Sequence, residues 1–303
     1  MDSLQCQERA TDAKNEKTKK HTTNPGKTLD VFIFCGHFLS CSIMDMDERT
    51  AHNQTVVDQF SKQATPFAEK SALSDESIFH LLLDASGVGP DDTVLDVACG
   101  PGLVSCAFAA RARHVTGIDL TPAMIEKAEQ LQKTKGLLNV SWQIADVAPL
   151  PFADRSFSMV ITRYSFHHFL HPGAVLAEMS RVCQSGGKLV VVDVTLAPAK
   201  QEAYNHVEKL RDPSHVRALT LPELLALMDD QGLLVTKQCA YGLDVDLDRV
   251  LAASFPNPGD VPQLREIFER DLTSNDLGLG TYKIKNQIHF AYPTTVIVAE
   301  NSV

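Results

Sequence analysis

The stretch VLDVACGPG, residues 94–102, is the most informative part of this 303-residue sequence. An apolar run typical of a buried strand leads into a glycine-rich turn, and Asp96 stands four positions before the first glycine. Such a turn predicts a site for a nucleotide-type cofactor, the alternative being an ordinary strand and helix joined by a tight bend. A dinucleotide-binding turn requires a third glycine three residues after the second, but Ser105 occupies that position. No Lys-Ser or Lys-Thr pair directly follows the turn, so a phosphate-cradling loop is excluded.

Two more acidic residues are expected at the ends of other strands. VTGID, residues 115–119, ends in Asp119, where a carboxylate can accept both ribose hydroxyls of an adenosine. IADV, residues 144–147, brings an acid and an apolar residue that suit the amine and one face of a purine. Ligands of parallel sheets bind beyond the carboxyl ends of the strands, so all three acids are expected on one rim. Because Asp96 suits a cationic ammonium and sulfonium, S-adenosylmethionine is favoured over NAD.

The segment after Asp119 predicts a helix that begins at the same rim. Thr121 and Pro122 suit its N-cap and first position, and its apolar residues recur at helical spacing. Met124 is either a core residue of this helix or a contact of the adenine face. The residues predicted to bind the cofactor are Asp96, Ala98, Gly100, Gly102, Asp119, Leu120, Met124, Asp146, Val147 and Arg163.

Residues 55–300 resemble the class I S-adenosylmethionine-dependent methyltransferases, in particular the small-molecule branch (methyltransferase type 11 domain) that includes the ubiquinone/menaquinone biosynthesis enzymes. Besides the three acids and the glycine turn, the resemblance rests on ITRYSFHHF at 161–169, LAEMSRV at 176–182 and SGGK at 185–188. It implies an α/β, Rossmann-like fold: a seven-stranded, mostly parallel sheet with helices on both faces and an antiparallel last strand. That strand, near 288–299, would lie between the strands near 187–194 and 233–241, with a bulge at Pro293.

The order of predicted elements agrees with such a sheet, because helices alternate with strands near 93–98, 114–119, 140–145, 157–162 and 187–194. Two helices are expected before them, at 55–62 and 75–85. We expect a single domain over 46–303. Three segments outside the alternation, 46–73, 196–220 and 242–285, are expected to form lids over an acceptor pocket.

The first 45 residues differ in composition from the rest. Up to Lys27 they are polar and lysine-rich, so an N-terminal extension without stable structure is expected over 1–45. The apolar patch at 31–39 is too short and too interrupted to span a bilayer, and it begins too late for a secretory signal. A cytoplasmic protein without an integral membrane segment is therefore expected.

Charge and cysteine content narrow the partners further. The net charge of -10 argues against a nucleic-acid substrate, because phosphate backbones are bound by concentrated basic surfaces. Seven scattered cysteines lack paired metal-ligand spacing, so no metal is expected and the thiols are expected to be reduced. The expected partner is a small-molecule methyl acceptor, and the expected assembly is a monomer or homodimer.

Methyl transfer is an in-line displacement at an activated sulfonium, so the protein mainly places and desolvates the reactants. If the acceptor must lose a proton, the base is expected to be His168 or His167, although either imidazole is equally suited to bind backbone at the strand end. Arg163 is expected to meet the cofactor carboxylate or the acceptor, or else to pair with Asp154 or Glu178.

The predicted acceptor pocket contains Phe67, Arg211, His215 and Arg217, the last three of which alternatively tie a lid down by ion pairs. The sequence predicts methyl transfer to O, C or N of a small organic acceptor, within small-molecule metabolism. The alternatives are a quinone-ring C-methyltransferase, a cofactor-binding protein without transfer activity, and an NAD-linked oxidoreductase, which Ser105 disfavours.

Overall fold

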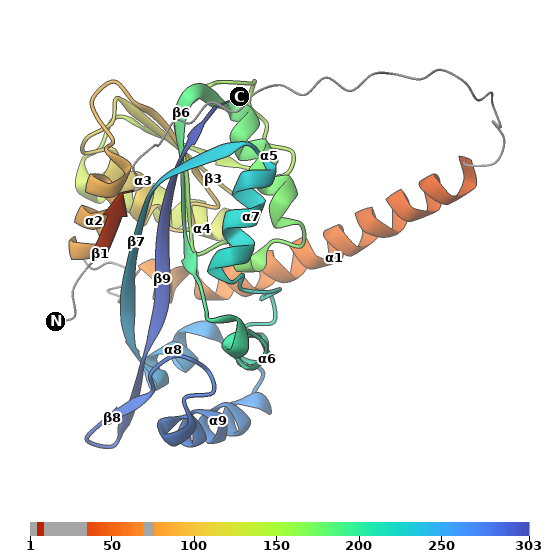
Figure 1. Cartoon of the computed structure of the whole chain (residues 1–303), viewed down its shortest axis with the longest axis vertical. Coiled ribbons are helices and arrows are strands. Elements are labelled where there is room, and N and C mark those ends of the chain that lie inside the picture. Colours follow the sequence, from red (N-terminus) through yellow and green to blue (C-terminus); the bar gives the residue numbers. More distant parts are fainter. Residues whose placement is uncertain (1–4, 9–34, 69–75, 303) are drawn as a thin grey trace, which may run out of the picture.

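The computed structural model describes residues 5–8, 35–68 and 76–302, and for 5–8 and 35–46 it describes the backbone only (Figure 1). Its strands form one sheet in the order β1-β7-β9-β6-β5-β2-β3-β4, with β8 paired to β9. The strands are β1 (Gln5–Glu8), β2 (Thr93–Val97), β3 (His114–Asp119), β4 (Val140–Ile144), β5 (Phe157–Arg163), β6 (Cys183–Val194), β7 (Leu233–Asp246), β8 (Tyr282–Ile284) and β9 (Gln287–Asn301).

The topology confirms the predicted fold class. Strands β2 to β6 pair in parallel, and β9 lies antiparallel between β6 and β7. The bulge predicted at Pro293 is absent, since Pro293 pairs in register with Gly242 and the irregularity of β7 lies between Val235 and Lys237. Proline is tolerated at this position because the pairing of β6 with β9 ends at Val194 and Thr294, next to Pro293. The Pro293 carbonyl accepts a hydrogen bond from the Thr195 backbone N–H.

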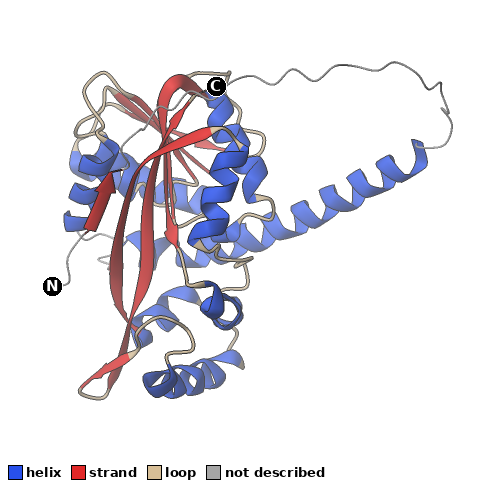
Figure 2. Cartoon of the chain, viewed as in Figure 1, coloured by secondary structure: helices blue, strands red, loops and turns tan. Residues whose placement is uncertain are grey.

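Helices cover both faces of the sheet (Figure 2). They are α1 (Cys35–Ala68), α2 (Glu76–Ser86), α3 (Leu103–Phe108), α4 (Pro122–Lys135), α5 (Pro172–Val182), α6 (Gln201–Arg211), α7 (Leu221–Asp230), α8 (Leu247–Ser254) and α9 (Asp260–Ser274). Successive residues of β2 enter different cores: Val94 packs in a cluster with Leu82 of α2, whereas Leu95 packs in one with Leu176 of α5. This alternation makes the strands apolar on both faces, as buried parallel strands require.

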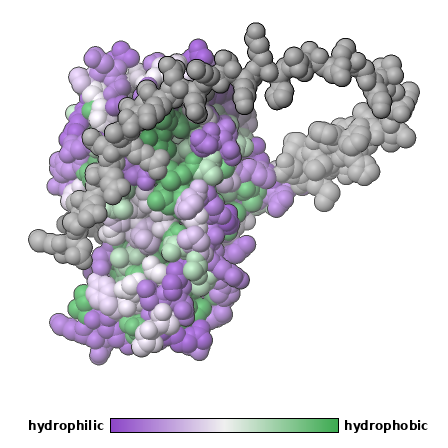
Figure 3. Space-filling view, in the orientation of Figure 1, coloured by the Kyte–Doolittle hydropathy of each residue, from purple (hydrophilic) through white to green (hydrophobic). Residues whose placement is uncertain are grey.

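A third core lies beyond the ends of the parallel strands. It joins α6, α8 and α9 to the far part of β9 and includes Tyr204, Leu264, Phe268 and Phe290. In Figure 3 the outer side of this part, over α9, is largely hydrophilic, which agrees with apolar residues turned inward. The segments 196–220 and 242–285 therefore pack largely against one another and β9.

Helix α4 begins at the residues expected from its sequence. Thr121 is the N-cap and Pro122 the first residue, but the Thr121 hydroxyl makes no capping hydrogen bond. Instead, the Thr121 backbone N–H donates to Asp119 Oδ1 over 2.8 Å. The helix ends at Gly136, whose φ of 66° is the left-handed conformation that favours glycine. The beginning of α4 is thus tied to a predicted cofactor residue.

The N-terminal 45 residues are described only at Gln5–Glu8, which pair antiparallel with β7, and from Cys35, where α1 begins. The rest of the predicted extension, and residues 69–73 of the first predicted lid, lie outside the described residues. Across the described ranges, no helix is long and apolar enough to cross a membrane. Cys99, Cys106 and Cys183 are free, whereas Cys239 is disulfide-bonded, so the expectation of reduced thiols is wrong for Cys239.

Candidate active site

A cavity of about 220 Å³ lies at the carboxyl ends of β2, β3 and β5, beneath α1. Nine of the ten predicted cofactor residues line it: Asp96, Ala98, Gly100, Asp119, Leu120, Met124, Asp146, Val147 and Arg163. Parallel pairing of β2 with both β3 and β5, and of β3 with β4, brings these positions to one rim although they lie up to 67 residues apart.

The tenth residue, Gly102, shapes the turn from behind. Its φ is 78°, and a Cβ at this position would lie 2.6 Å from the Trp142 ring and 2.8 Å from the Ala128 Cβ. Only glycine therefore allows α3 to begin this close to α4 and β4. In front of it, Gly100 N donates to Asp119 Oδ2 over 2.8 Å, which joins the turn to the end of β3.

Asp96 is almost fully buried at the base of the cavity, and Ser105 Oγ donates to its Oδ2 over 2.6 Å. Burial raises the pKa of Asp96 to about 7, although the Ser105 hydrogen bonds and Arg163 act in the opposite direction. A cation placed beside this carboxylate would stabilise its charged form. Ser105, which in the sequence only marked a missing glycine, thus holds the first acid in place.

Asp119 accepts one backbone N–H on each carboxylate oxygen, from Gly100 and Thr121, both at 2.8 Å. Burial raises its pKa, and these hydrogen bonds lower it in part. Since each carboxylate oxygen offers about two lone-pair sites, both retain the capacity to accept a ligand hydroxyl. The carboxylate is fixed in orientation by bonds that leave it able to bind a diol.

Asp146 is held by the roof of the cavity. Its Oδ2 contacts Arg49 Nη2 at 2.7 Å and Asn53 Nδ2 at 2.6 Å, both from α1, and its Oδ1 accepts the Ala148 backbone N–H. The sequence analysis expected a helix only over 55–62. A repeat of three- and four-residue steps through Arg49, Asn53, Val56 and Phe60 is the signal that extends this face toward the N-terminus.

The same face of α1 continues along the cavity. His52 Nε2 donates to the His168 carbonyl over 2.7 Å, and the Phe60 ring meets the His168 ring edge-on at 5.0 Å. Further along, Gln63 Nε2 donates to Asp212 Oδ2 over 3.0 Å. Phe67 lines the cavity and packs against Phe60. One helix therefore contacts Asp146, His168 and Asp212, which lie in three different connections between elements.

Arg163 ends β5 and lines the cavity with its guanidinium over two rings, 5.2 Å from the Phe79 centroid and 4.7 Å from that of Tyr164. Asp154 and Glu178, its alternative partners in the sequence analysis, both bind Arg181 instead. Stacking over these two aromatic faces holds the guanidinium at the rim of the cavity.

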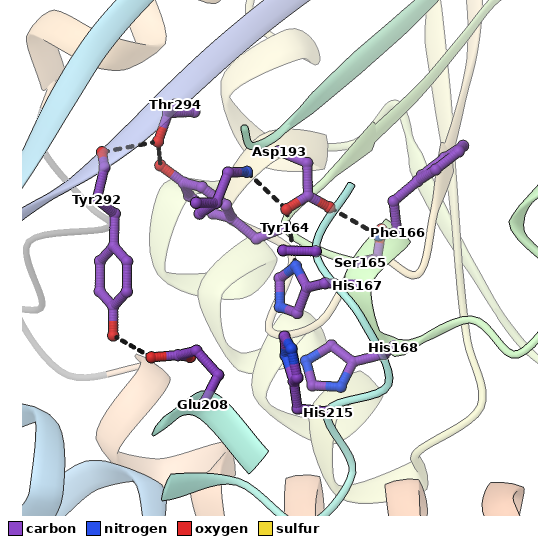
Figure 4. A network of polar contacts seen from close by, with 12 residues as sticks. Tyr164, Ser165, Phe166, His167, His168, Asp193, Glu208, His215, Tyr292 and Thr294 are labelled. Carbon is purple, nitrogen blue, oxygen red and sulfur yellow. Dashed lines mark hydrogen bonds and ion pairs between the residues drawn. The ribbon is translucent and has the colours of Figure 1, made fainter. Parts of the chain in front are cut away.

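The two histidines of the HHF run have different surroundings (Figure 4). His167 Nδ1 lies 2.7 Å from Asp193 Oδ1, and its side chain is not among those lining the cavity. Burial disfavours its charged form, but Asp193 outweighs burial and raises its pKa. His168 lines the cavity, and its Nδ1 lies 3.0 Å from the Ser214 carbonyl. Burial and the neighbouring His167 lower its pKa to about 4, so His168 is neutral near pH 7.

The remaining predicted pocket residues lie outside the cavity lining. Arg211 contacts Glu208 through Nε at 2.9 Å and Nη2 at 2.5 Å, and His215 Nε2 lies 2.7 Å from Asn205 Oδ1. Arg217 pairs with Glu223. These are the ion-pair and hydrogen-bond contacts of the alternative interpretation. In the described part of the chain, no three His, Cys, Asp or Glu side chains gather as metal ligands.

Comparisons with known proteins agree with this fold. A family model described as "Methyltransferase domain" matches residues 95–191, which span β2 to most of β6. The "Uncharacterized methyltransferase YcgJ" of Bacillus subtilis (strain 168) is 30% identical over 209 residues, covering 68% of this chain and 81% of that protein. The crystal structure of YcgJ superposes with a TM-score of 0.70 at 25% identity, over 75% of this chain and 99% of the other. The "Uncharacterized protein YafE" of Escherichia coli (strain K12) is 37% identical over 129 residues, which cover 42% of this chain and 62% of that protein.

Proposed function

This chain belongs to the class I S-adenosylmethionine-dependent methyltransferases, and we propose that it transfers a methyl group to O, C or N of a small organic acceptor. The observation that carries the proposal is the gathering of Asp96, Asp119 and Asp146 around one cavity. Their three strand ends offer separate anionic groups to a ligand that carries a cation, a ribose and a purine amine. We further propose that the protein acts in the cytoplasm on small metabolites.

The residues fit the cofactor along its length. Asp96, buried with a pKa of about 7, would pair with the ammonium, and the stacked Arg163 with the carboxylate. Asp119 would accept the ribose hydroxyls through its remaining lone pairs. Asp146 would accept the purine amine, between the apolar side chains of Met124 and Val147. When bound, the cofactor supplies a sulfonium-activated methyl group, so the protein's part is orientation and exclusion of water.

His168 is the candidate base for an acceptor that must lose a proton. It lines the cavity, is neutral near pH 7, and lies directly after the strand that carries Arg163. His167 is committed to Asp193 and would act on His168 rather than on the acceptor. In-line displacement requires the acceptor atom to approach opposite the leaving sulfur, and the space near Phe60, Phe67 and His168 is proposed to hold it.

Titration calorimetry tests the cofactor site. Wild type should bind S-adenosylmethionine, and Asp119→Ala and Gly100→Ala should each weaken binding at least about tenfold. Asp119→Ala removes the acceptor of the Gly100 N–H, and Gly100→Ala strains the turn, because Gly100 has a positive φ. Asp84→Ala, which removes an exposed pair with Arg111, is the control. Wild-type affinity in both site variants would refute the assignment. Tight binding without acceptor-dependent release of S-adenosylhomocysteine would favour a binding protein over an enzyme.

A further inference from the structure

We propose that Asp212 and Ser214 are positioning residues that hold His168 as a general base, and that the acceptor is an uncharged aromatic or enolic hydroxyl compound. This inference rests on the proposed methyl transfer and extends it to the acceptor. Asp212 and Ser214 lie two residues apart in the loop after α6, whereas His168 lies 46 residues before Ser214. The fold brings that loop against the end of β5, behind the cavity.

The three side chains form a buried chain of hydrogen bonds. His168 Nδ1 lies 3.0 Å from the Ser214 carbonyl and 3.2 Å from Ser214 Oγ. Ser214 Oγ donates to Asp212 Oδ1 over 2.5 Å, and the Ser214 backbone N–H donates to the same oxygen over 2.9 Å. Gln63 Nε2 donates to the other carboxylate oxygen. Exposure is 8% for His168, 1% for Asp212 and zero for Ser214, so water does not compete for these contacts.

This geometry fixes the tautomer of His168. A carbonyl oxygen only accepts hydrogen bonds, so the proton of the neutral imidazole must be on Nδ1, where it faces Ser214. Nε2 then carries the lone pair, and His168 is the member of the chain that lines the cavity. An imidazole with its far nitrogen anchored and its near nitrogen basic is the arrangement that general-base catalysis requires.

The net effect of the surroundings keeps this base neutral at rest, but Asp212 and the Ser214 carbonyl favour its protonated form. His167 and Arg211 disfavour a charge on His168, as burial does, whereas Asp212 favours it. Arg211 is committed to Glu208, and His215, whose ring centroid lies 6.3 Å from that of His168, has a pKa lowered by burial (Figure 4). Asp212 itself has a lowered pKa, because His168 and Arg211 outweigh burial. An ionised Asp212 is therefore available when His168 takes up a proton.

The bonds, the proton and the charge of the transfer all balance with these groups alone. The acceptor oxygen forms a bond to the methyl carbon while the carbon–sulfur bond breaks and its electron pair stays on sulfur. The hydroxyl proton passes to His168 Nε2, so the positive charge lost from the sulfonium appears on the imidazolium. Nδ1–H remains hydrogen-bonded to Ser214, whose hydroxyl carries the stabilising effect of Asp212. For an enol, the same proton is lost while the carbon is methylated.

The surroundings of His168 indicate the body of the acceptor. Phe60 meets the His168 ring at an interplanar angle of 78°, and Phe67 packs on Phe60 with centroids 6.2 Å apart. Among the described residues lining the cavity, the two arginines are Arg49, paired with Asp146, and Arg163, assigned to the cofactor. With Arg49 paired and Arg163 given to the cofactor in the proposed function, no arginine of the described lining is left for an acceptor carboxylate, whereas an aromatic ring matches the phenylalanine edges.

The test compares two acceptors that differ in their need for a base. Methyl transfer from S-adenosylmethionine to phenol and to 4-nitrophenol is followed by release of S-adenosylhomocysteine, at a pH between the two phenol pKa values. Phenol then requires a base, whereas 4-nitrophenol is already ionised. His168→Asn should lower kcat on phenol by about 10²-fold or more, and Asp212→Asn and Ser214→Ala by about tenfold, while kcat on 4-nitrophenol changes little. Asp248→Asn, in an exposed pair with Arg265, is the matched control.

Each outcome decides a separate point. Equal loss on both acceptors in the variants, or loss on neither, overturns the role of Asp212 and Ser214. Ser214→Ala keeps the backbone carbonyl and fills the same space, so it carries the test if Asp212→Asn fails to fold. Binding of S-adenosylmethionine without transfer to either phenol in wild type overturns the acceptor class but leaves the proposed function intact. Absence of S-adenosylmethionine binding refutes the proposed function itself.

Discussion

Ser105 Oγ donates a hydrogen bond to Asp96 Oδ2 over 2.6 Å, from the first turn of α3 back to β2. The position that a dinucleotide-binding turn reserves for glycine thus carries a side chain that orients the buried acid. The bond opposes the effect of burial on Asp96, whose pKa nevertheless reaches about 7. The turn therefore presents a carboxylate whose charge depends on pH and on a bound cation.

The pKa of Asp96 predicts a pH dependence of cofactor binding. Below pH 7 the unliganded carboxyl is protonated, so affinity for S-adenosylmethionine should fall by up to about tenfold per pH unit and level off above pH 7. Calorimetry across this range measures the slope. Asp96→Asn should bind weakly at every pH and lose the slope, and an unchanged slope in that variant would show that another group titrates.

The same pKa predicts the stability of the unliganded protein. The folded carboxyl holds its proton up to about pH 7, whereas an unfolded one releases it near 3.8, so the folded state binds more protons between these values. Stability should therefore decrease as pH rises from about 4 to 7, and Asp96→Asn should raise the Tm at pH 8 by several degrees or more. Thermal unfolding without ligand checks this; Asp248→Asn should leave the Tm unchanged.

Gly102 and Gly136 both have positive φ, but only Gly102 is closely packed. Substitutions at the two positions therefore distinguish the cost of lost packing space from the cost of backbone strain. Gly136→Ala meets open space and should cost about 1 kcal/mol of unfolding free energy from strain alone. Gly102→Ala adds contacts of 2.6 Å to Trp142 and 2.8 Å to Ala128, and should cost about 2–4 kcal/mol in total. Urea unfolding gives both values, and equal losses would contradict the packing role of Gly102.

The three-residue spacing of Glu178 and Arg181 indicates an isolated surface pair, but Arg181 makes further contacts. It also donates to the carbonyls of Phe152 and Leu150 and binds Asp154. Arg181→Lys cannot reproduce this fork and should reduce the unfolding free energy by about 1–2 kcal/mol. Arg265→Lys, whose exposed arginine pairs with Asp248, should cost less than about 0.5 kcal/mol. Similar losses would mean that the backbone contacts contribute little.

Arg49 should stabilise bound cofactor by holding α1 over it. Asp146 Oδ1 accepts only the Ala148 N–H among the contacts described for it, so a purine amine can join without displacing Arg49. Arg49→Gln should weaken S-adenosylmethionine binding about two- to fivefold through faster dissociation, as expected for a half-exposed pair. Gln54→Ala, on the exposed side of α1, is the control. Tighter binding in Arg49→Gln would show that Arg49 competes with the cofactor.

Much of the fold and of the lining of the candidate site could be predicted, because both depend on local patterns. The apolar strand, the glycine turn and the helix start at Thr121 are encoded within a few residues of each other. The parallel arrangement then brings Asp96, Asp119 and Asp146 to one edge, whatever the loops do. The sequence predicted only 55–62 of α1, since the stretch DERTAHNQ at 47–54 is polar and its contacts with Asp146 come from across the fold.

The acceptor side depended on contacts that no local pattern reveals. His167 and His168 are adjacent, yet one faces Asp193 on β6 and the other faces the cavity and Ser214. The polar run at 211–217 divides in the same way: Arg211 pairs with Glu208 within α6 and Arg217 with Glu223 of α7, while Asp212 turns toward Gln63.

By itself, the sequence determined the class of sheet, the rim of the candidate site and the three acids that line it, because strand period, turn chemistry and the handedness of parallel connections act locally. Only the tertiary structure decided which histidine reaches the cavity, what roofs it and what stands behind the base. Those choices join residues 46 positions apart, for His168 and Ser214, and 149 apart, for Gln63 and Asp212. At such separations, the packing of whole helices against the sheet, and not the residue pattern, determines which polar groups meet.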